Sequence, residues 1–172
     1  MELLIPGLIL VALMVWASTR IKRNAAAAFD AELIETAEFS ISKPEGFLHV
    51  LNDDSGLAFR AYSKDFGTVG SRDVRQSTIE IEALRGTDIE KRLKEISADA
   101  GSIGPVETYI DGGEKAALVR TTAVIDGGKF DVARKLITRG DTVYEVRVTT
   151  LSEFIGAHSD EIESILDSVR VD

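Results

Sequence analysis

The fold is decided by residues 106–149, VETYIDGGEKAALVRTTAVIDGGKFDVARKLITRGDTVYEVRVT. Two Asp-Gly pairs, Asp111-Gly112 and Asp126-Gly127, stand between runs rich in apolar and β-branched residues. This pattern is a strong hairpin signal, because Asp and Gly adopt the positive φ angles of a tight two-residue turn. Gly140-Asp141 provides a third turn. The stretch therefore predicts four antiparallel strands, at Val106–Ile110, Ala116–Ile125, Lys129–Thr138 and Thr142–Thr149.

The sequence before this stretch adds further strands. Apolar and polar residues alternate at Glu38–Ser42 and at Ser77–Leu84, where Glu80 faces outward. Leu57–Tyr62 also reads as a strand, whereas Gly67–Gly70 predicts a loop.

Two amphipathic helices are predicted to cover this sheet. Thr87 and Glu90 have the spacing of a capping box, and apolar residues then recur at helical intervals until Gly101. The closing helix carries an apolar stripe made of Leu151, Ile155, His158, Ile162, Ile165, Leu166 and Val169. Hairpin strands covered by helices indicate an α+β domain, large enough for one core.

The first residues of the chain have a different character. No charged residue occurs from Leu3 to Thr19, and a helix of about 17 residues is about 25 Å long, close to the thickness of a hydrocarbon core. Trp16 lies near the basic end of the run, as an interfacial anchor does. We predict a single-pass membrane helix that inserts into the lipid bilayer through Leu3, Leu4, Ile5, Leu8, Ile9, Leu10 and Trp16.

Charge sets the expected orientation of this anchor. The juxtamembrane basic residues Arg20, Lys22 and Arg23 all follow the apolar run, which places the following domain on the cytoplasmic side of an inner or plasma membrane. A cleaved signal peptide, followed by a free exported domain, is the alternative, although only Glu2 precedes the run where a signal peptide carries positive charge. The alanines after Arg23 predict a helical stalk up to Leu33. Residues 1–35 are therefore assigned to anchor and stalk, and residues 36–172 to the domain.

Composition excludes several classes of protein. The 172 residues include no cysteine, which rules out disulfides, thiolate zinc sites and cysteine nucleophiles. Without Glu2 and the three juxtamembrane basic residues, the 20 basic and 29 acidic residues become 17 and 28, a net charge of −11 for the remainder. Such an acidic domain is repelled by nucleic acid, so we expect no nucleic-acid partner.

Catalytic sequence motifs are absent: no nucleotide-binding glycine loop, zinc-protease motif or nucleophile elbow occurs. His49 and His158 lie far apart, and we interpret His158 as a boundary residue with a satisfied hydrogen bond. Arg134 alternates with apolar residues, which indicates an acid across the sheet, a strand edge or a ligand pocket. Three acidic pairs lack the spacing of a calcium loop and are explained by turns: Asp53 with Asp54, Asp111 with Glu114, and Asp126 with Asp131. We assign no catalytic residue, metal site or cofactor.

Two short motifs resemble the ends of PsbP-like domains. The stretch FSISKPEGF, residues 39–47, resembles their opening aromatic strand and Pro-x-Gly-aromatic turn. Ile162–Val171 resembles their closing helix, which runs into Ser-Phe-x-Val, with Val169 in place of the usual Phe. The resemblance implies an α/β/α sandwich around an antiparallel sheet. It also implies a mostly non-enzymatic group, which includes photosystem accessory proteins and a Ran-binding yeast protein, and whose bacterial members are often exported.

These features predict a single-pass, membrane-anchored, non-enzymatic binding or accessory protein. Its expected partner is another membrane protein or complex. The alternative is a small-ligand-binding or metal-dependent enzyme domain, which requires a pocket between sheet and helices lined by convergent polar groups.

Overall fold

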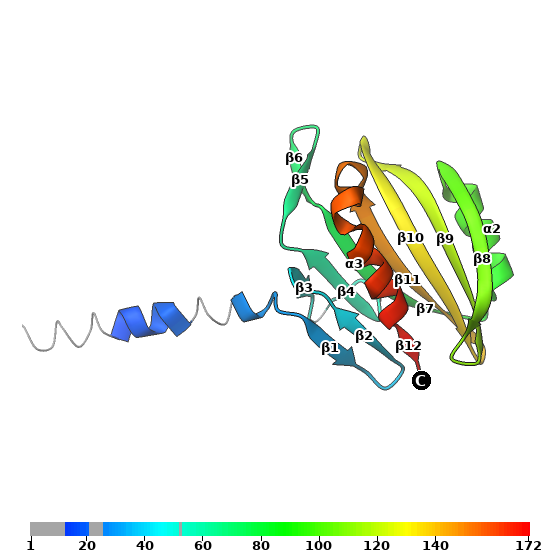
Figure 1. The fold of residues 1–172 in the computed structure, drawn as a ribbon, viewed down its shortest axis with the longest axis horizontal. Coiled ribbons are helices and arrows are strands. Elements are labelled where there is room, and N and C mark those ends of the chain that lie inside the picture. Colours follow the sequence, from blue (N-terminus) through cyan, green and yellow to red (C-terminus); the bar gives the residue numbers. More distant parts are fainter. Residues whose placement is uncertain (1–12, 21–25, 52) are drawn as a thin grey trace, which may run out of the picture.

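A seven-stranded antiparallel sheet forms the centre of the computed structural model, which describes residues 13–20, 26–51 and 53–172 (Figure 1). The four strands predicted from residues 106–149 are confirmed, and each extends beyond its predicted bounds. In spatial order the sheet consists of β3 (Phe47–His49), β4 (Phe59–Ser63), β7 (Ser77–Arg85), β11 (Thr142–Leu151), β10 (Gly128–Arg139), β9 (Glu114–Ile125) and β8 (Ser102–Asp111).

Tight turns join the last four strands. Gly112 and Gly113, with φ angles of 58° and 93°, connect β8 to β9. Asp126 and Gly127, with φ angles of 53° and 87°, connect β9 to β10. Positive φ at both central residues is the requirement of the type I′ turn, whose twist matches that of the strands it joins. The two Asp-Gly signals therefore produce both turns, although Asp111 itself ends β8.

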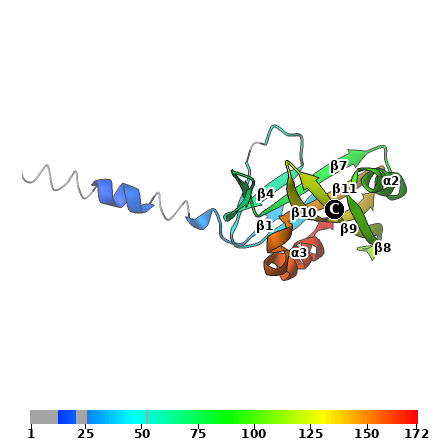
Figure 2. The same cartoon turned by 90° about the horizontal axis from the view of Figure 1, so that it is seen from above.

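Two helices cover opposite faces of the sheet (Figure 2). Helix α2 (Ile89–Asp99) packs on one face, and helix α3 (Ile155–Ser168), which follows the short helix η1 (Ser152–Phe154), packs on the other. The result is the expected α+β fold, an antiparallel sheet between helices.

The α3 face holds the larger core. Ile162, Ile165 and Leu166 of α3 are buried, and the helix packs on β2, β10 and β11, in a cluster that also includes residues of β4 and β7. A second, three-stranded sheet closes this side, with β2 (Phe39–Lys43) between β1 (Glu32–Glu35) and β12 (Arg170–Val171). The residues that follow the closing helix thus form a strand, β12, that pairs with Phe39 and Ser40 in the first motif of the domain.

The α2 face has a smaller core. Ile96 packs with Leu136, Val143 and residues of β9, and Ile89 and Leu93 lie at the margin. The predicted capping box is wrong by one residue, because Asp88 is the N-cap and its carboxylate accepts a hydrogen bond from the Lys91 amide at 2.7 Å.

The loop predicted at residues 67–70 is also wrong. These residues belong to a hairpin of β5 (Phe66–Val69) and β6 (Arg72–Arg75). Gly67 is required by packing and not by a turn: a Cβ at this position would lie 2.5 Å from Leu151 Cδ1 and 2.7 Å from Phe154 Cε2. Glycine here lets the hairpin approach the end of the sheet closely.

The predicted membrane anchor lies mostly outside the described residues, which omit Leu3, Leu4, Ile5, Leu8, Ile9, Leu10, Lys22 and Arg23. Residues 13–20 are helical, with an exposed Trp16 whose ring centre lies 5.3 Å from the guanidinium carbon of Arg20. Among the helices that the structure describes, none combines the length and apolar character needed to cross a bilayer. The anchor therefore stays a prediction.

The helical stalk predicted up to Leu33 is wrong at its C-terminal end. Between residue 26 and the start of β1 at Glu32, only Ala26 and Ala27 are helical. The helix propensity of alanine is overridden by tertiary contacts, because β1 pairs antiparallel with β2 along its whole length.

The segment that enters β1 is fixed to the domain. The Phe29 carbonyl accepts a hydrogen bond from the Gly46 amide at 2.7 Å. The buried Lys43 ammonium donates to the carbonyls of Asp30 and Phe47. The chain is therefore joined to the domain from Phe29 onward.

Candidate functional site

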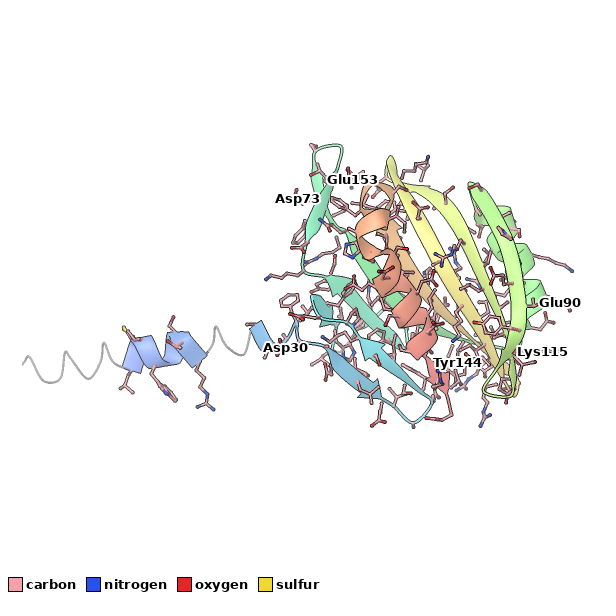
Figure 3. All side chains as sticks on the ribbon, viewed as in Figure 1. Asp30, Asp73, Glu90, Lys115, Tyr144 and Glu153 are labelled. Carbon is pink, nitrogen blue, oxygen red and sulfur yellow. The ribbon has the colours of Figure 1, made fainter. Side chains whose placement is uncertain are left out.

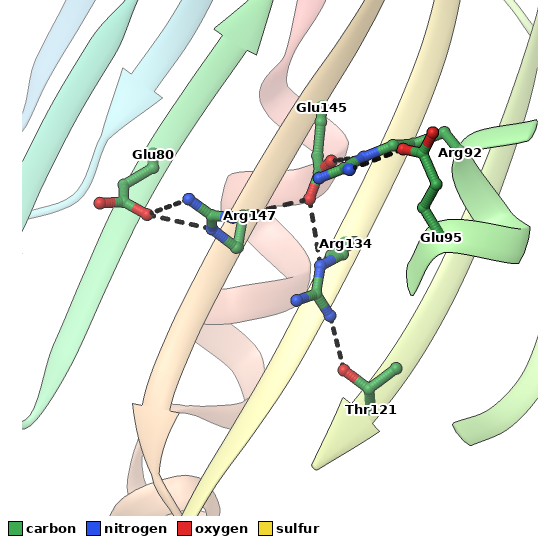
Figure 4. Close-up of polar contacts among 7 residues, drawn as sticks. All are labelled: Glu80, Arg92, Glu95, Thr121, Arg134, Glu145 and Arg147. Atoms are coloured by element: carbon green, nitrogen blue, oxygen red, sulfur yellow. Dashed lines mark hydrogen bonds and ion pairs between the residues drawn. The ribbon is translucent and has the colours of Figure 1, made fainter. Parts of the chain in front are cut away.

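A buried carboxylate, Glu145 of β11, organises the charged part of the α2 face. Its side chain is 1% exposed. Its Oε2 accepts a hydrogen bond from Arg92 Nε at 2.6 Å, and its Oε1 accepts one from Arg134 Nε at 3.1 Å (Figure 4). A buried charge is costly unless it is paired, so these two guanidinium groups are what make Glu145 tolerable.

Strand register and one helix bring the three side chains together. Arg134 lies opposite Arg147 in the β10–β11 ladder, so Glu145 is its diagonal neighbour on the same face. Arg92 reaches the carboxylate from α2 and is also held by Glu95 at 3.0 Å. Arg134 is fixed further by the hydroxyl of Thr121 at 2.5 Å. The prediction that Arg134 pairs with an acid across the sheet is confirmed.

The cluster continues towards the part of the sheet beyond α2. Arg147 donates two hydrogen bonds to Glu80 Oε2, at 2.7 and 3.0 Å, and its Nη1 lies 4.0 Å from Glu145. Arg60 Nε lies 3.4 Å from Glu80, and Arg60 also pairs with Asp53 at 3.7 Å. Glu80 does face away from the α3 core, but two arginines cover it.

A small pocket opens where the guanidinium groups meet. Its volume is about 130 Å³, and its polar wall includes Arg92, Arg134, Arg147 and Thr121. Asp99, at the end of α2, is the acidic residue of the lining. The carboxylate of Glu145 is not part of the wall, because it lies behind the arginines that it holds.

The two partners of Glu145 differ in their electrostatic surroundings. Burial lowers the pKa of Arg134; Glu145 opposes this, while Arg147 and Arg92 lower the pKa further. Burial acts in the same direction on Arg92, but its hydrogen bond and ion pair with Glu145 outweigh it and raise the pKa above its ordinary value. Burial therefore dominates at Arg134, whereas pairing with carboxylates dominates at Arg92.

A second surface feature lies at the far edge of the sheet, where β8 pairs only with β9 among the described strands. The strand exposes Ile103, Val106, Tyr109 and Ile110. A groove of about 700 Å³ runs beside it, between β8, β9 and the start of α2. Glu90 of α2 and Lys115 of β9, both labelled in Figure 3, line this groove.

The histidines have separate structural surroundings. His158 Nδ1 lies 2.7 Å from Glu161 Oε2, and its Nε2 lies 3.3 Å from Gln76 Oε1, which confirms the interpretation of a boundary residue with satisfied hydrogen bonds. His49 is partly buried, with its ring centre 4.8 Å from that of Phe59. Burial lowers the pKa of His49.

The acidic pairs of the sequence have basic or backbone partners. Asp111 lies 2.6 Å from Lys135, and Glu114 lies 2.9 Å from Arg139. Asp53 accepts a hydrogen bond from the Ser55 amide at 2.9 Å, as an Asx turn does. Across the described residues, no group of three or more His, Cys, Asp or Glu is arranged to hold a metal ion.

Comparison with known proteins shows the fold. No protein-family model and no curated protein sequence matches the chain. Among solved structures, it is similar to LpqN of Mycobacterium tuberculosis, described as involved in cell envelope biogenesis, with a TM-score of 0.61 and 12% identity over 83% of this chain and 90% of that one.

Two further structures connect the fold with the resemblance seen in the sequence. The cyanobacterial PsbP protein of Synechocystis sp. PCC 6803 has a TM-score of 0.56 and 11% identity over 84% of this chain and 94% of that one. The Ran-binding protein Mog1p of Saccharomyces cerevisiae has a TM-score of 0.53 and 11% identity over 83% and 96%. The chain spans only 49% of a similar structure from Bacteroides thetaiotaomicron. The domain has a PsbP/Mog-like fold.

Proposed function

We propose that the protein is a membrane-anchored, non-enzymatic binding protein that docks a protein partner on the outer edge of β8. The observation that carries the proposal is the edge itself, which has apolar side chains exposed along a strand that pairs on one side only within the described chain. Unpaired edges with exposed apolar residues favour pairing with another chain.

The two halves of β8 differ in how open they are. Pro105 and a register shift between Ile103 and Val106 interrupt the first half, and proline and bulges are common ways to protect an edge. Val106–Asp111 pairs regularly with β9 and contains no lysine or arginine. We therefore assign the docking position to residues 106–111, where an extended segment of the partner would add an eighth strand.

One similar structure supports a binding role, since Mog1p is described as a Ran-binding protein. Membrane anchoring is supported by the sequence, whose N-terminal apolar run and basic residues favour insertion in a bilayer with the domain on the cytoplasmic side.

Docking is tested by placing a charge on the edge. Ile110, 66% exposed, is changed to lysine, and the matched control is Leu51→Lys at a residue that is 74% exposed in a loop. The full chain is crosslinked in native membranes and purified in neutral detergent. We expect one specific crosslinked protein, present for the parent chain and Leu51→Lys and lost for Ile110→Lys. Equal crosslinking of all three chains would disprove the docking position.

Anchoring is tested separately, and the absence of cysteine makes the design simple. A single cysteine is introduced at Ser55, an exposed loop residue. We expect the intact chain to resist carbonate extraction from membranes and to react with an impermeant maleimide only after the cells are opened. Reaction in intact cells, or an intact mass that lacks the N-terminal run, would show an exported domain instead.

A further inference from the structure

We infer that the pocket between Arg92, Arg134 and Arg147 binds a small oxyanion, either a phosphate or a carboxylate group. This site is independent of the β8 edge, because it lies on the α2 face at the other end of the helix.

The guanidinium groups retain donors for a ligand. Arg134 uses Nε and Nη1 on Glu145 and Thr121, and Arg92 uses Nε and Nη1 on Glu145 and Glu95. Neither Nη2 makes a hydrogen bond to any residue that the structure describes. Arg147 Nη1 has only a contact of 4.0 Å with Glu145. Guanidinium N–H groups match the planar and tetrahedral oxygens of carboxylates and phosphates.

The lining of the pocket favours an anion. Three arginines line it against one acidic lining residue, the exposed Asp99. Glu145, Glu95 and Glu80 pair with these arginines, so the preference for an oxyanion rests on the N–H donors that the carboxylates leave unused.

The geometry is set before any ligand arrives. Glu145 holds Arg92 and Arg134 from behind, Thr121 holds Arg134 from the side, and Glu80 holds Arg147 with two hydrogen bonds. Little side-chain freedom is left to lose on binding, which improves affinity. The volume of about 130 Å³ accommodates a single phosphate or carboxylate group with its nearest water, and excludes large ligands.

The test is titration calorimetry of the full chain in neutral detergent, at constant ionic strength, with phosphate, sulfate and acetate as separate probes. We expect saturable binding of at least one probe. A preference for phosphate and sulfate would define a phosphoryl site, and a preference for acetate a carboxylate site. No saturable binding of any of the three at millimolar concentration would overturn the inference.

Variants separate the pocket from the fold. Arg134→Gln removes one guanidinium but also weakens the surroundings of Glu145, so Arg147→Gln, which leaves both short contacts of Glu145 intact, is the decisive variant. We expect Arg147→Gln to weaken binding by about tenfold. The control is Arg139→Gln, on the same strand as Arg134 but in an exposed pair with Glu114. Equal binding by Arg147→Gln and Arg139→Gln would also overturn the inference.

Discussion

The two faces of the central sheet hold their buried charges differently. The α3 face is closed by a helix and a second sheet over a large apolar core, in which the buried Lys43 and Lys135 donate to backbone carbonyls and Lys135 also pairs with Asp111. The α2 face has a small apolar core under its helix, and beside it a buried carboxylate with arginines on three elements. Both faces accept the cost of buried charge, but the α3 face offsets it with a larger burial of apolar surface.

This difference separates a face that mainly stabilises the fold from a face that also borders a candidate binding pocket. Replacing a buried ion pair with apolar residues is often neutral or stabilising, so a buried charge cluster is weak support for a purely structural role. The cluster also borders a pocket of about 130 Å³, whereas a pocket on the α3 side, beside Ile137 and Val169, has a volume of about 30 Å³. The predictions below test the contrast from its strongest consequence to its weakest.

The largest effect is expected for Glu145→Gln. The change leaves Arg92 and Arg134 partly buried against a neutral amide, and breaking a buried pair in this way costs about 3–5 kcal/mol. The free energy of unfolding, measured by urea denaturation, reports the loss. Glu114→Gln is the control, because its partner Arg139 is exposed and such pairs contribute about 0–1 kcal/mol. Equal losses for both variants would mean that Glu145 is not a buried charge in solution.

Matched truncations in the two helices are expected to differ. Ile162 of α3 and Ile96 of α2 are buried to similar extents, and an isoleucine-to-alanine change in a core costs about 2–5 kcal/mol. Ile162 packs in the larger cluster, so we expect its truncation to lie at the upper end of this range and that of Ile96 at the lower end. Urea denaturation of both variants measures the two losses of unfolding free energy. A larger loss for Ile96→Ala than for Ile162→Ala would contradict the contrast between the faces.

The start of α2 provides a smaller effect. Asp88→Ala removes the side-chain cap and is expected to cost about 1 kcal/mol. Thr87→Val is expected to cost nothing or to stabilise slightly, because the Thr87 hydroxyl is buried without a hydrogen-bond partner in the described chain. Thermal unfolding of the two variants distinguishes them. A loss of stability for Thr87→Val as large as that for Asp88→Ala would instead support Thr87 as the capping residue.

The smallest effect concerns His49, at the margin of the α3 face. Burial lowers its pKa, Glu32 opposes this and Lys43 adds to it, so the folded protein binds the proton less readily than the unfolded chain. The contribution of neutral His49 to the free energy of unfolding is therefore complete above the ordinary histidine pKa, about 6.5. This contribution is lost as the pH falls through the lower pKa that His49 has in the folded protein. His49→Gln should flatten this part of the stability profile. An unchanged profile in the variant would assign the pH dependence to other groups.

The hairpins were predictable because their signals are local. Gly112, Asp126 and Gly127 specify turns within a few residues of the strands they join. The charge cluster was only half visible in the sequence: Arg134 stood out between apolar neighbours, but Arg92 looks like any exposed residue of an amphipathic helix. Its partner lies 53 residues away, and nothing in a single sequence connects the two.

Two of the errors arise where contacts with another segment override the local signal. The strand β1 forms in a segment where local propensity favours a helix, because β2 supplies its hydrogen bonds. Gly67 suggested a loop, but it serves the packing of Leu151 and Phe154, more than 80 residues later. Glu145 could have been noticed as a charge between the apolar residues Tyr144 and Val146.

The attachment at Phe29 limits the reach of the domain. Between Arg20, the end of the described N-terminal helix, and Phe29 the chain can extend at most about 30 Å, because each residue contributes about 3.3–3.6 Å. Under the proposed anchoring, this short connection joins the membrane helix to a segment that the Lys43 and Gly46 hydrogen bonds hold against the domain. A docking position on a membrane partner would then have to lie near the lipid surface for the domain to reach it.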